Sequence, residues 1–151
     1  MQKLISRLRS ERGQTLLEFA AIFPIVLLLL LLLIDFGVAI DHRQVIQHAV
    51  REGARHGAVG LSESDVVDSV VANSGGELES DDITVCYVDG PDGQPAGNAG
   101  SAIRVSATSG YDFTLGSGAI LSGMGVGPLT ITMSPSADAR LETSVTGADE
   151  C

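Results

Sequence analysis

The sequence contains no Trp, and aromatic residues make up only 4% of its 151 residues. Apolar residues nevertheless make up 44% of the chain. A chain of this length has room for one modest domain. High apolar content with so few aromatic residues is unlike an ordinary soluble domain. We therefore expect part of the apolar content to serve another purpose.

Basic residues are scarce over most of the chain. From Asp41 onward there are five basic and sixteen acidic residues. Binding to phosphate backbones requires a basic surface. The acidic balance therefore argues against a nucleic-acid partner.

Motifs for nucleotide binding and hydrolysis are missing as well. The glycine-rich stretch 116–127 contains no Lys, which excludes a phosphate-binding loop. No Ser lies in a Gly-x-Ser-x-Gly elbow. We see no catalytic constellation, so we expect neither an enzyme nor a cofactor.

Two groups of residues resemble metal ligands superficially. His48, Glu52 and His56 recur every four residues, but groups spread over two helical turns do not easily reach one zinc ion. Four acidic residues have side chains suited to calcium, but a solvated acidic loop is the simpler interpretation: Asp81, Asp82, Asp89 and Asp92. We expect no metal site.

The apolar residues are concentrated in one segment near the N-terminus. Residues 19–34 include no charged or polar side chain, and residues 27–33 are seven consecutive leucines. From Leu16 to Ile34 a helix is about 28 Å long, close to a bilayer core of about 30 Å. We predict a single transmembrane helix over 14–40. The alternative is a cleaved secretory signal peptide, with Gly37-Val38-Ala39 as its small-residue site.

The charges beside this segment predict its orientation. Residues 1–13 carry four basic residues against Glu11, whereas the chain after Asp41 is strongly acidic. Basic flanks stay on the cytoplasmic side of a membrane. We therefore expect a cytoplasmic leader, a single pass through the cytoplasmic membrane and an extracytoplasmic C-terminal domain.

The pattern beyond the span predicts an α+β domain over 41–145. Small and apolar residues recur at helical spacing up to Val59, so one helix is expected to run from about Gln14 to about Val59. Ser62 and Asp65 have capping-box spacing before a short helix, which residues 73–76 (Asn-Ser-Gly-Gly) are expected to end. Alternating residues then predict a 3–4 stranded antiparallel sheet; the strands are expected near 83–88, 103–107, 129–133 and 137–141. Residues 146–151 show no pattern and are expected to be a loose tail.

Two further pairs are informative. Gly53 and Gly57 have the Gly-x-x-x-Gly spacing that permits close approach to a helix. Because they lie beyond the span, we expect them to pack against the domain's own sheet.

Cys86 and Cys151 both lie on the expected outer side, where oxidising conditions allow a disulfide. Two unpaired thiols remain the alternative.

The motif that points to function begins at Gly13, directly after the basic leader. Four residues separate Gly13 from Glu18, and Phe19 follows at the start of the apolar segment. A carboxylate at that position is costly in lipid, about 2.5 kcal/mol or more at mid-bilayer, unless a cation neutralises it. Cutting after Gly13 would make the amine of Gln14 such a cation, in the same chain or in a neighbouring subunit.

This segment resembles the TadE-like pseudopilins of tight-adherence (type IVc, Flp-type) pilus systems. The resemblance rests on the Gly13…Glu18-Phe19 signal and on further residues along the segment: Ala20, Pro24, Asp35-Phe36-Gly37 and Ala49-Val50-Arg51-Glu52-Gly53-Ala54-Arg55. Flp-type signals more often continue Glu-Tyr, whereas TadE-like ones commonly show Glu-Phe, as here. The last part of the sequence resembles the family loosely, at residues 136–141.

The resemblance implies a minor pilin or pseudopilin that takes part in assembling a tight-adherence pilus or a related secretion apparatus. It implies that a prepilin peptidase cuts between Gly13 and Gln14, removing residues 1–13, and that Glu18 and Phe19 act in assembly. The implied partners are the lipid bilayer, the prepilin peptidase, other pilin or pseudopilin subunits, and the inner-membrane assembly platform. The alternative is a membrane-anchored extracytoplasmic binding or secretion-linked protein that never enters a filament.

Overall fold

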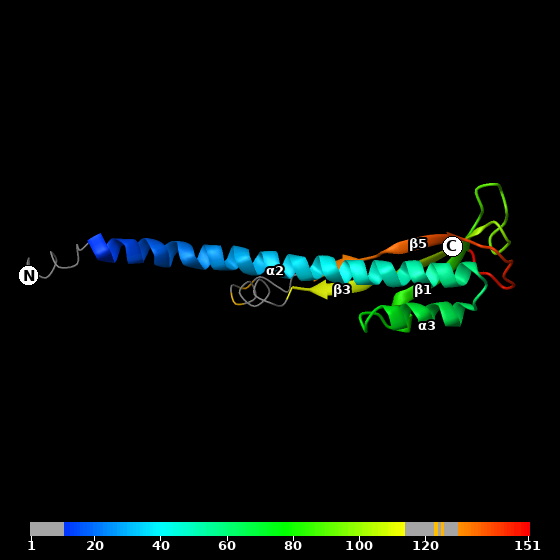
Figure 1. Cartoon of the computed structure of the whole chain (residues 1–151), viewed down its shortest axis with the longest axis horizontal. Helices are drawn as coiled ribbons and strands as arrows, with labels where there is room; N and C mark the ends of the chain where they lie inside the picture. The colour runs from blue at the N-terminus through cyan, green and yellow to red at the C-terminus, as the bar shows by residue number, and fades with distance from the viewer. Residues whose placement is uncertain (1–10, 114–122, 124, 126–129) are drawn as a thin grey trace, which may run out of the picture. The chain divides into compact units, whose positions relative to one another are not determined.

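The computed structural model describes residues 11–113, 123, 125 and 130–151 (Figure 1). The chain divides into two compact units. The helical unit comprises residues 1–37 and 113–129, and the α+β unit comprises residues 38–112 and 130–151. The glycine-rich stretch 116–127 of the sequence lies outside the described residues, apart from Gly123 and Gly125.

The first described element is one long helix, α2 (Glu11–Ala58), of 48 residues. Its bounds agree with the predicted helix from about Gln14 to about Val59. Pro24 lies inside α2 without ending it. A proline removes one backbone hydrogen bond from a helix, a loss that membrane-type helices tolerate. Within the described residues, α2 is the one helix long and apolar enough to cross a membrane.

The second helix, α3 (Glu63–Asn73), begins and ends at the predicted residues. The Ser62 hydroxyl accepts a hydrogen bond from the Asp65 backbone N–H at 3.3 Å, as an N-cap should. At the C-terminal end, Ser74 is followed by Gly75 and Gly76, whose φ angles of 68° and 92° only glycine adopts readily. Local sequence chemistry therefore determines both ends of α3.

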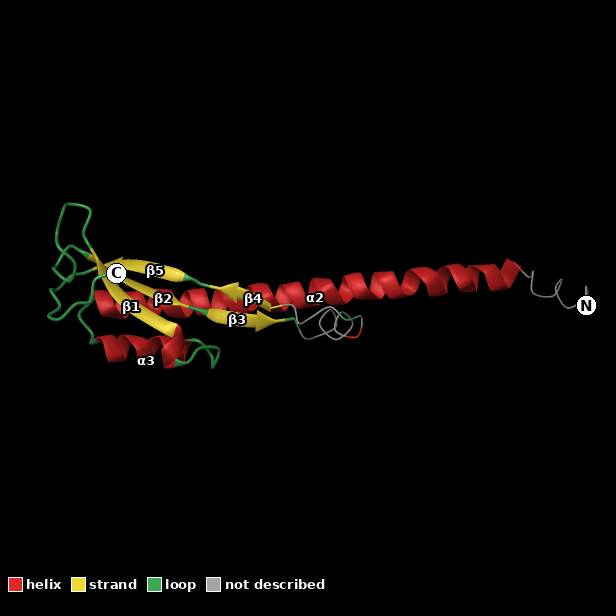
Figure 2. Cartoon of the chain, turned by 180° about the vertical axis from the view of Figure 1, so that it is seen from behind, coloured by secondary structure: helices red, strands yellow, loops and turns green. Residues whose placement is uncertain are grey.

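Among the described residues, five strands and a short 3-10 helix follow the two helices (Figure 2). The three-stranded antiparallel sheet has the order β1-β2-β5, and β3 and β4 form a two-stranded sheet. The bounds are η2 (Ser80–Asp82), β1 (Ile83–Val88), β2 (Ala102–Ala107), β3 (Ser109–Asp112), β4 (Thr130–Met133) and β5 (Ser136–Arg140). The predicted α+β class, with a long helix, a short helix and antiparallel strands, is confirmed.

The two sheets share one register. The β3–β4 pair Ser109↔Met133 lies three residues beyond the β2–β5 pair Ser106↔Ser136 on both strands. Residues 102–112 and 130–140 therefore form one antiparallel ribbon with a short interruption. Pro135 lies at that interruption and has no N–H to donate, although its carbonyl accepts from the Ala107 N–H at 3.0 Å. The sequence did not predict β3, which is four residues long and contains Gly110.

A single apolar core holds the α+β unit together. Alternate residues of β1 and β2 point inward, and the C-terminal part of α2 covers them together with α3 (Figure 1). The fully buried members are drawn from α2, α3 and β2: Ile46, Ala49, Val50, Val66, Val70, Ile103 and Val105. Small side chains on α2 therefore face branched side chains on its neighbours.

Gly53 and Gly57 make this packing possible. A Cβ built on Gly53 would lie 2.3 Å from Cγ2 of Val70, and one on Gly57 would lie 2.3 Å from Cδ1 of Ile103. Gly53 therefore faces α3, whereas Gly57 faces the sheet and also Val66 of α3. The sequence predicted packing against the sheet, which holds for Gly57. At Gly53 the partner is the short helix instead.

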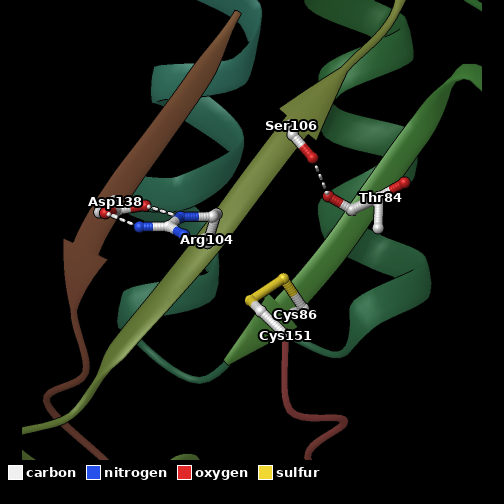
Figure 3. Close-up of a disulfide and its surroundings, with 6 residues drawn as sticks. All are labelled: Thr84, Cys86, Arg104, Ser106, Asp138 and Cys151. Atoms are coloured by element: carbon white, nitrogen blue, oxygen red, sulfur yellow. Dashed lines mark hydrogen bonds and ion pairs between the residues drawn. A yellow bond between two sulfur atoms is a disulfide. The ribbon is translucent and has the colours of Figure 1, made fainter. Parts of the chain in front are cut away.

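The C-terminal segment is held against β1. Cys151 forms a disulfide with Cys86, with their Cα atoms 5.1 Å apart (Figure 3). The Tyr87 N–H donates to the Asp149 carbonyl at 2.8 Å, and the Cys151 N–H donates to the Tyr87 carbonyl at 3.0 Å. Where the sequence suggested a loose tail, residues 149–151 thus lie along an edge of the sheet. A disulfide spanning 65 residues contributes about 4 kcal/mol in the chain-entropy model.

The outer face of the sheet carries a cross-strand ion pair. Arg104 donates two hydrogen bonds of 2.8 Å to the Asp138 carboxylate (Figure 3). The Arg104 guanidinium lowers the pKa of Asp138 through these hydrogen bonds. The pair stabilises the fold above the unfolded pKa of the carboxyl group, and this contribution is lost as pH falls through the lowered, folded pKa. Because both side chains are nearly half exposed, solvent keeps the contribution small.

We predict that Gly53→Ala destabilises the chain more than Gly57→Ala. Both contacted side chains are fully buried, but the added methyl group meets Cγ2 of Val70, which moves only with the stiff χ1 angle, in the first case and Cδ1 at the far end of the longer Ile103 in the second. Overpacking costs about 1–3 kcal/mol, and the helix preference for Ala over Gly offsets about 1 kcal/mol. The measurement is thermal unfolding of the full chain in detergent. Gly37→Ala is the control, because its Cβ meets nothing within 4 Å; equal stability of the Gly53 variant and this control would contradict the packing assignment.

Candidate processing and assembly site

The predicted processing residues lie on the first turns of α2. Gly13 and Gln14 are both exposed, and an added Cβ at Gly13 would meet nothing within 4 Å. No described residue covers the bond between them. None of the described residues therefore stands between this bond and a peptidase. Cleavage at this bond remains a prediction.

Glu18 and Phe19 lie one turn further along the same helix. The Gln14 side-chain amide donates to the Glu18 carboxylate over 3.3 Å, which is the i, i+4 contact of neighbouring turns. Glu18 is exposed, and Phe19 packs its ring against Phe23 at a centroid distance of 5.3 Å. The pair therefore presents a carboxylate beside an aromatic surface at the start of the apolar segment.

This spacing determines which cation can reach Glu18. Residues four apart lie on one face of a helix, about 6 Å apart along its axis. If residues 1–13 are removed, the new α-amine belongs to Gln14, the residue whose side chain already contacts Glu18. An amine at the same level on an adjacent helix would reach the carboxylate equally well. The site can therefore form an ion pair within one chain or between two.

Few of the described side chains cover the apolar part of α2. Large apolar side chains are exposed along most of it, with Leu17 at 73% and Leu33 at 74%, while Leu28, Leu31 and Leu32 are partly covered. An amphipathic helix of a soluble protein hides one apolar face, but this helix is apolar all round. Such a surface is stable only in lipid or against other apolar helices.

Asp35 lies at the far end of the leucine run and is fully buried. The next residue, Phe36, packs its ring against that of Phe113 at a centroid distance of 5.8 Å, and both belong to the helical unit. In the sequence, Asp35 stood out only as part of the Asp35-Phe36-Gly37 motif of the family resemblance. Its neighbours in the sequence gave no signal that it would be buried.

His42 is a second residue that sequence reasoning missed. Its side chain is 9% exposed, and Nδ1 lies 3.0 Å from a carboxylate oxygen of Glu77. Nε2 lies 3.0 Å from the hydroxyl of Ser109, and the ring packs near Tyr111 at 5.5 Å. His42 thus connects α2 to the loop after α3 and to β3. In the neutral ring, one nitrogen donates and the other accepts.

Two of the three residues considered as a zinc motif have other contacts. His56 Nδ1 lies 2.7 Å from the Ser69 hydroxyl of α3, and His56 Nε2 lies 3.4 Å from Glu52. His48 is exposed. The acidic residues considered for calcium also have structural contacts: Asp82 accepts from the Glu79 N–H, and Asp89 accepts from the Ala96 N–H. Among the described residues, no group of three or more potential ligands has the geometry of a metal site.

Comparison with protein families matches one segment of the chain. Residues 13–55 match the family described as TadE-like protein. The match begins at Gly13, includes Glu18 and Phe19, and ends at Arg55 on α2, before α3 and the sheets. No curated protein and no solved structure that was compared matches the chain.

We predict that His42→Ala destabilises the α+β unit by about 1–3 kcal/mol, since it leaves the buried Ser109 hydroxyl without its partner. His48→Ala is the matched control: the same change on the exposed face of the same helix should alter stability by less than about 0.5 kcal/mol. Chemical unfolding of the full chain in detergent measures both. Equal effects of the two substitutions would show that His42 does not connect the elements.

Proposed function

We propose that this chain, which carries a TadE-like segment over residues 13–55, is a minor pilin or pseudopilin. In this role it takes part in assembling a tight-adherence (Flp, type IVc) pilus or a related secretion apparatus. The family match supports involvement in tight-adherence pilus functions in general. The finer role is our proposal.

The observation that carries the proposal is the position of Glu18. It is an exposed carboxylate on a helix whose surrounding side chains are apolar and exposed, and it lies five residues after Gly13. A plain membrane anchor gains nothing from a charge there, because an unpaired charge is costly in lipid. A subunit that is cut after Gly13 and then packed beside other helices gains a cation for this carboxylate.

Pairing in a dry helix bundle would determine register more than it would add stability. Desolvation of a buried carboxylate and amine offsets most of their attraction, but a copy with the wrong alignment would leave both charges unpaired. The carboxylate therefore favours one alignment of each helix against its neighbour. The apolar surface of α2 supplies the attraction, and Glu18 supplies the specificity.

The disulfide supports an extracytoplasmic position for the α+β unit. Disulfides persist in oxidising compartments and are rare in the cytoplasm. Cys86 and Cys151 both lie in this unit. Together with the basic leader, this favours a single pass through the cytoplasmic membrane with the N-terminus in the cytoplasm.

In this proposal the protein acts through binding and assembly rather than catalysis. Prepilin peptidase removes residues 1–13, and the apolar part of α2 holds the subunit in the bilayer. The inner-membrane assembly platform then brings α2 beside the helices of other pilin or pseudopilin subunits. The α+β unit is carried on the outside of the resulting bundle.

A second candidate function is a membrane-anchored binding protein that never enters a filament. The observation that favours it is a polar hollow in the α+β unit. The hollow is lined by residues 60–63, Tyr87 and residues 143–147, several of which carry hydroxyl groups. Such a hollow suits a small polar ligand. An uncut N-terminus would favour this candidate.

We predict that the wild-type chain begins at Gln14 and that Gly13→Ala reduces this cleavage. One added methyl group in a fitted enzyme site typically costs about 10–200-fold. Mass spectrometry of the mature N-terminus measures the fraction cut. Gly37→Ala is the control, because it adds the same methyl group to α2 away from the cut. An intact wild-type Met1 would favour the anchored protein, and a start at Ile40 would indicate signal peptidase instead.

We predict that Glu18→Gln leaves cleavage intact but lowers incorporation into assembled pili by at least about tenfold, because a buried amine then lacks its counter-charge. The readout is the amount of this protein in sheared pilus fractions relative to membranes. Leu17→Ala serves as the control for a change of size without charge. Normal incorporation of the Gln variant would remove the proposed role of Glu18.

A further inference from the structure

One face of α2 within the α+β unit has no described partner. Its exposed residues follow helical spacing, so they form a single stripe: Gln44, His48, Arg51, Arg55 and Val59. Gly53, between the two arginines in sequence, points the opposite way, toward α3. The stripe therefore faces away from the unit's own core.

The two arginines of this stripe lack the ion pairs that Arg104 and Arg140 make. Arg104 pairs with Asp138, and Arg140 lies 3.8 Å from Asp92. Arg51 and Arg55 make no ion pair with any residue that the structure describes. In a chain with nine Lys and Arg against nineteen Asp and Glu, two adjacent unpaired arginines are a marked local excess of positive charge.

Lipid headgroups are poorly placed to be their partner. At about 1.5 Å per residue, Arg51 and Arg55 lie about 16 Å and about 22 Å along α2 beyond Ile40, the end of the predicted span. The headgroup layer on each side of a bilayer is only about 5–8 Å thick. Both guanidinium groups therefore carry positive charge beyond that layer.

The complementary surface is on α3 of the same chain. Glu63, Asp65 and Asp68 are exposed there, and residues 61–103 contain no Lys, Arg or His. A shallow hollow on this surface is lined by Glu63, Val67 and Asp68, together with Ser64 and Ser80. An arginine can lay its methylene stem on Val67 while its guanidinium meets the carboxylates. The hollow therefore suits a guanidinium side chain.

We propose that the Arg51–Arg55 stripe of one copy docks on the Glu63–Asp68 surface of a second copy of this chain. The observation that supports this proposal is the charge complementarity of the two surfaces. The proposal rests on the proposed function only because that function brings copies of the chain side by side. The two surfaces differ, so the contact is heterologous: each copy offers its stripe to one neighbour and its α3 surface to another. Such contacts build rings or open helical series rather than two-fold symmetric pairs.

Two reversed variants of the full chain test the contact. The first variant carries Arg51→Glu and Arg55→Glu, and the second carries Glu63→Lys and Asp68→Lys. Two differently tagged copies are expressed together, extracted in mild detergent and purified through one tag. We expect co-purification of the second copy for wild type and a fall of about tenfold when both copies carry the same reversed variant. Copies of the two different variants should associate again, because their charges are complementary.

Arg43→Glu is the matched control, since it makes the same charge change at an exposed position of α2 away from the stripe; it should leave co-purification at the wild-type level. Restored association of the mixed variants also shows that each variant folds. Unchanged association of either variant with itself, or no association of the mixed variants, overturns the proposal.

Flotation with vesicles of phosphatidylglycerol and phosphatidylethanolamine tests the lipid alternative. If the double Arg variant loses vesicle binding but keeps association between copies, the stripe binds lipid and the proposal is wrong. The mature N-terminus of the same samples is determined in parallel. A chain that is not cut after Gly13 contradicts the proposed function, whereas loss of co-purification in the variants still supports this contact.

Discussion

The packing of the α+β unit depends on how closely α3 and β2 approach the backbone of α2. Gly53 and Gly57 have no Cβ, and this lets Val70 of α3 and Ile103 of β2 approach to distances that any side chain on α2 would prevent. Because α3 and β2 both meet the helix there, the two glycines determine where the short helix and the sheet lie. His56 contacts Ser69 of α3 one turn beyond Gly53, and the acidic side of α3 faces outward as a result.

The sequence was sufficient wherever local chemistry decides the structure. The bounds of α3 followed from Ser62 and from Gly75 and Gly76, and β1 and β2 followed from alternation. The apolar segment predicted a membrane-type helix, and the Gly13…Glu18-Phe19 signal identified the family to which residues 13–55 are matched. In each case a few neighbouring residues hold the necessary information.

The sequence was insufficient where distant segments decide. Asp35 is buried and His42 connects α2 to Glu77 and Ser109, yet neither residue is marked by its neighbours in sequence. The short strand β3 becomes recognisable only through its partner β4. Residues 149–151 lie against β1 through backbone hydrogen bonds, which no side-chain pattern records. Contacts of this kind require the whole fold to be known.

The shared register of the two sheets limits how the ribbon can change during evolution. Losing one residue from either strand, without a matching loss opposite, would turn every side chain beyond that point to the other face. Core residues such as Ile103 and Val105 would then exchange places with Arg104. Insertions and deletions are therefore tolerated in the connection 113–129 rather than in the ribbon. Proteins that share this fold are expected to differ in the length of that connection while their two strands keep a constant offset.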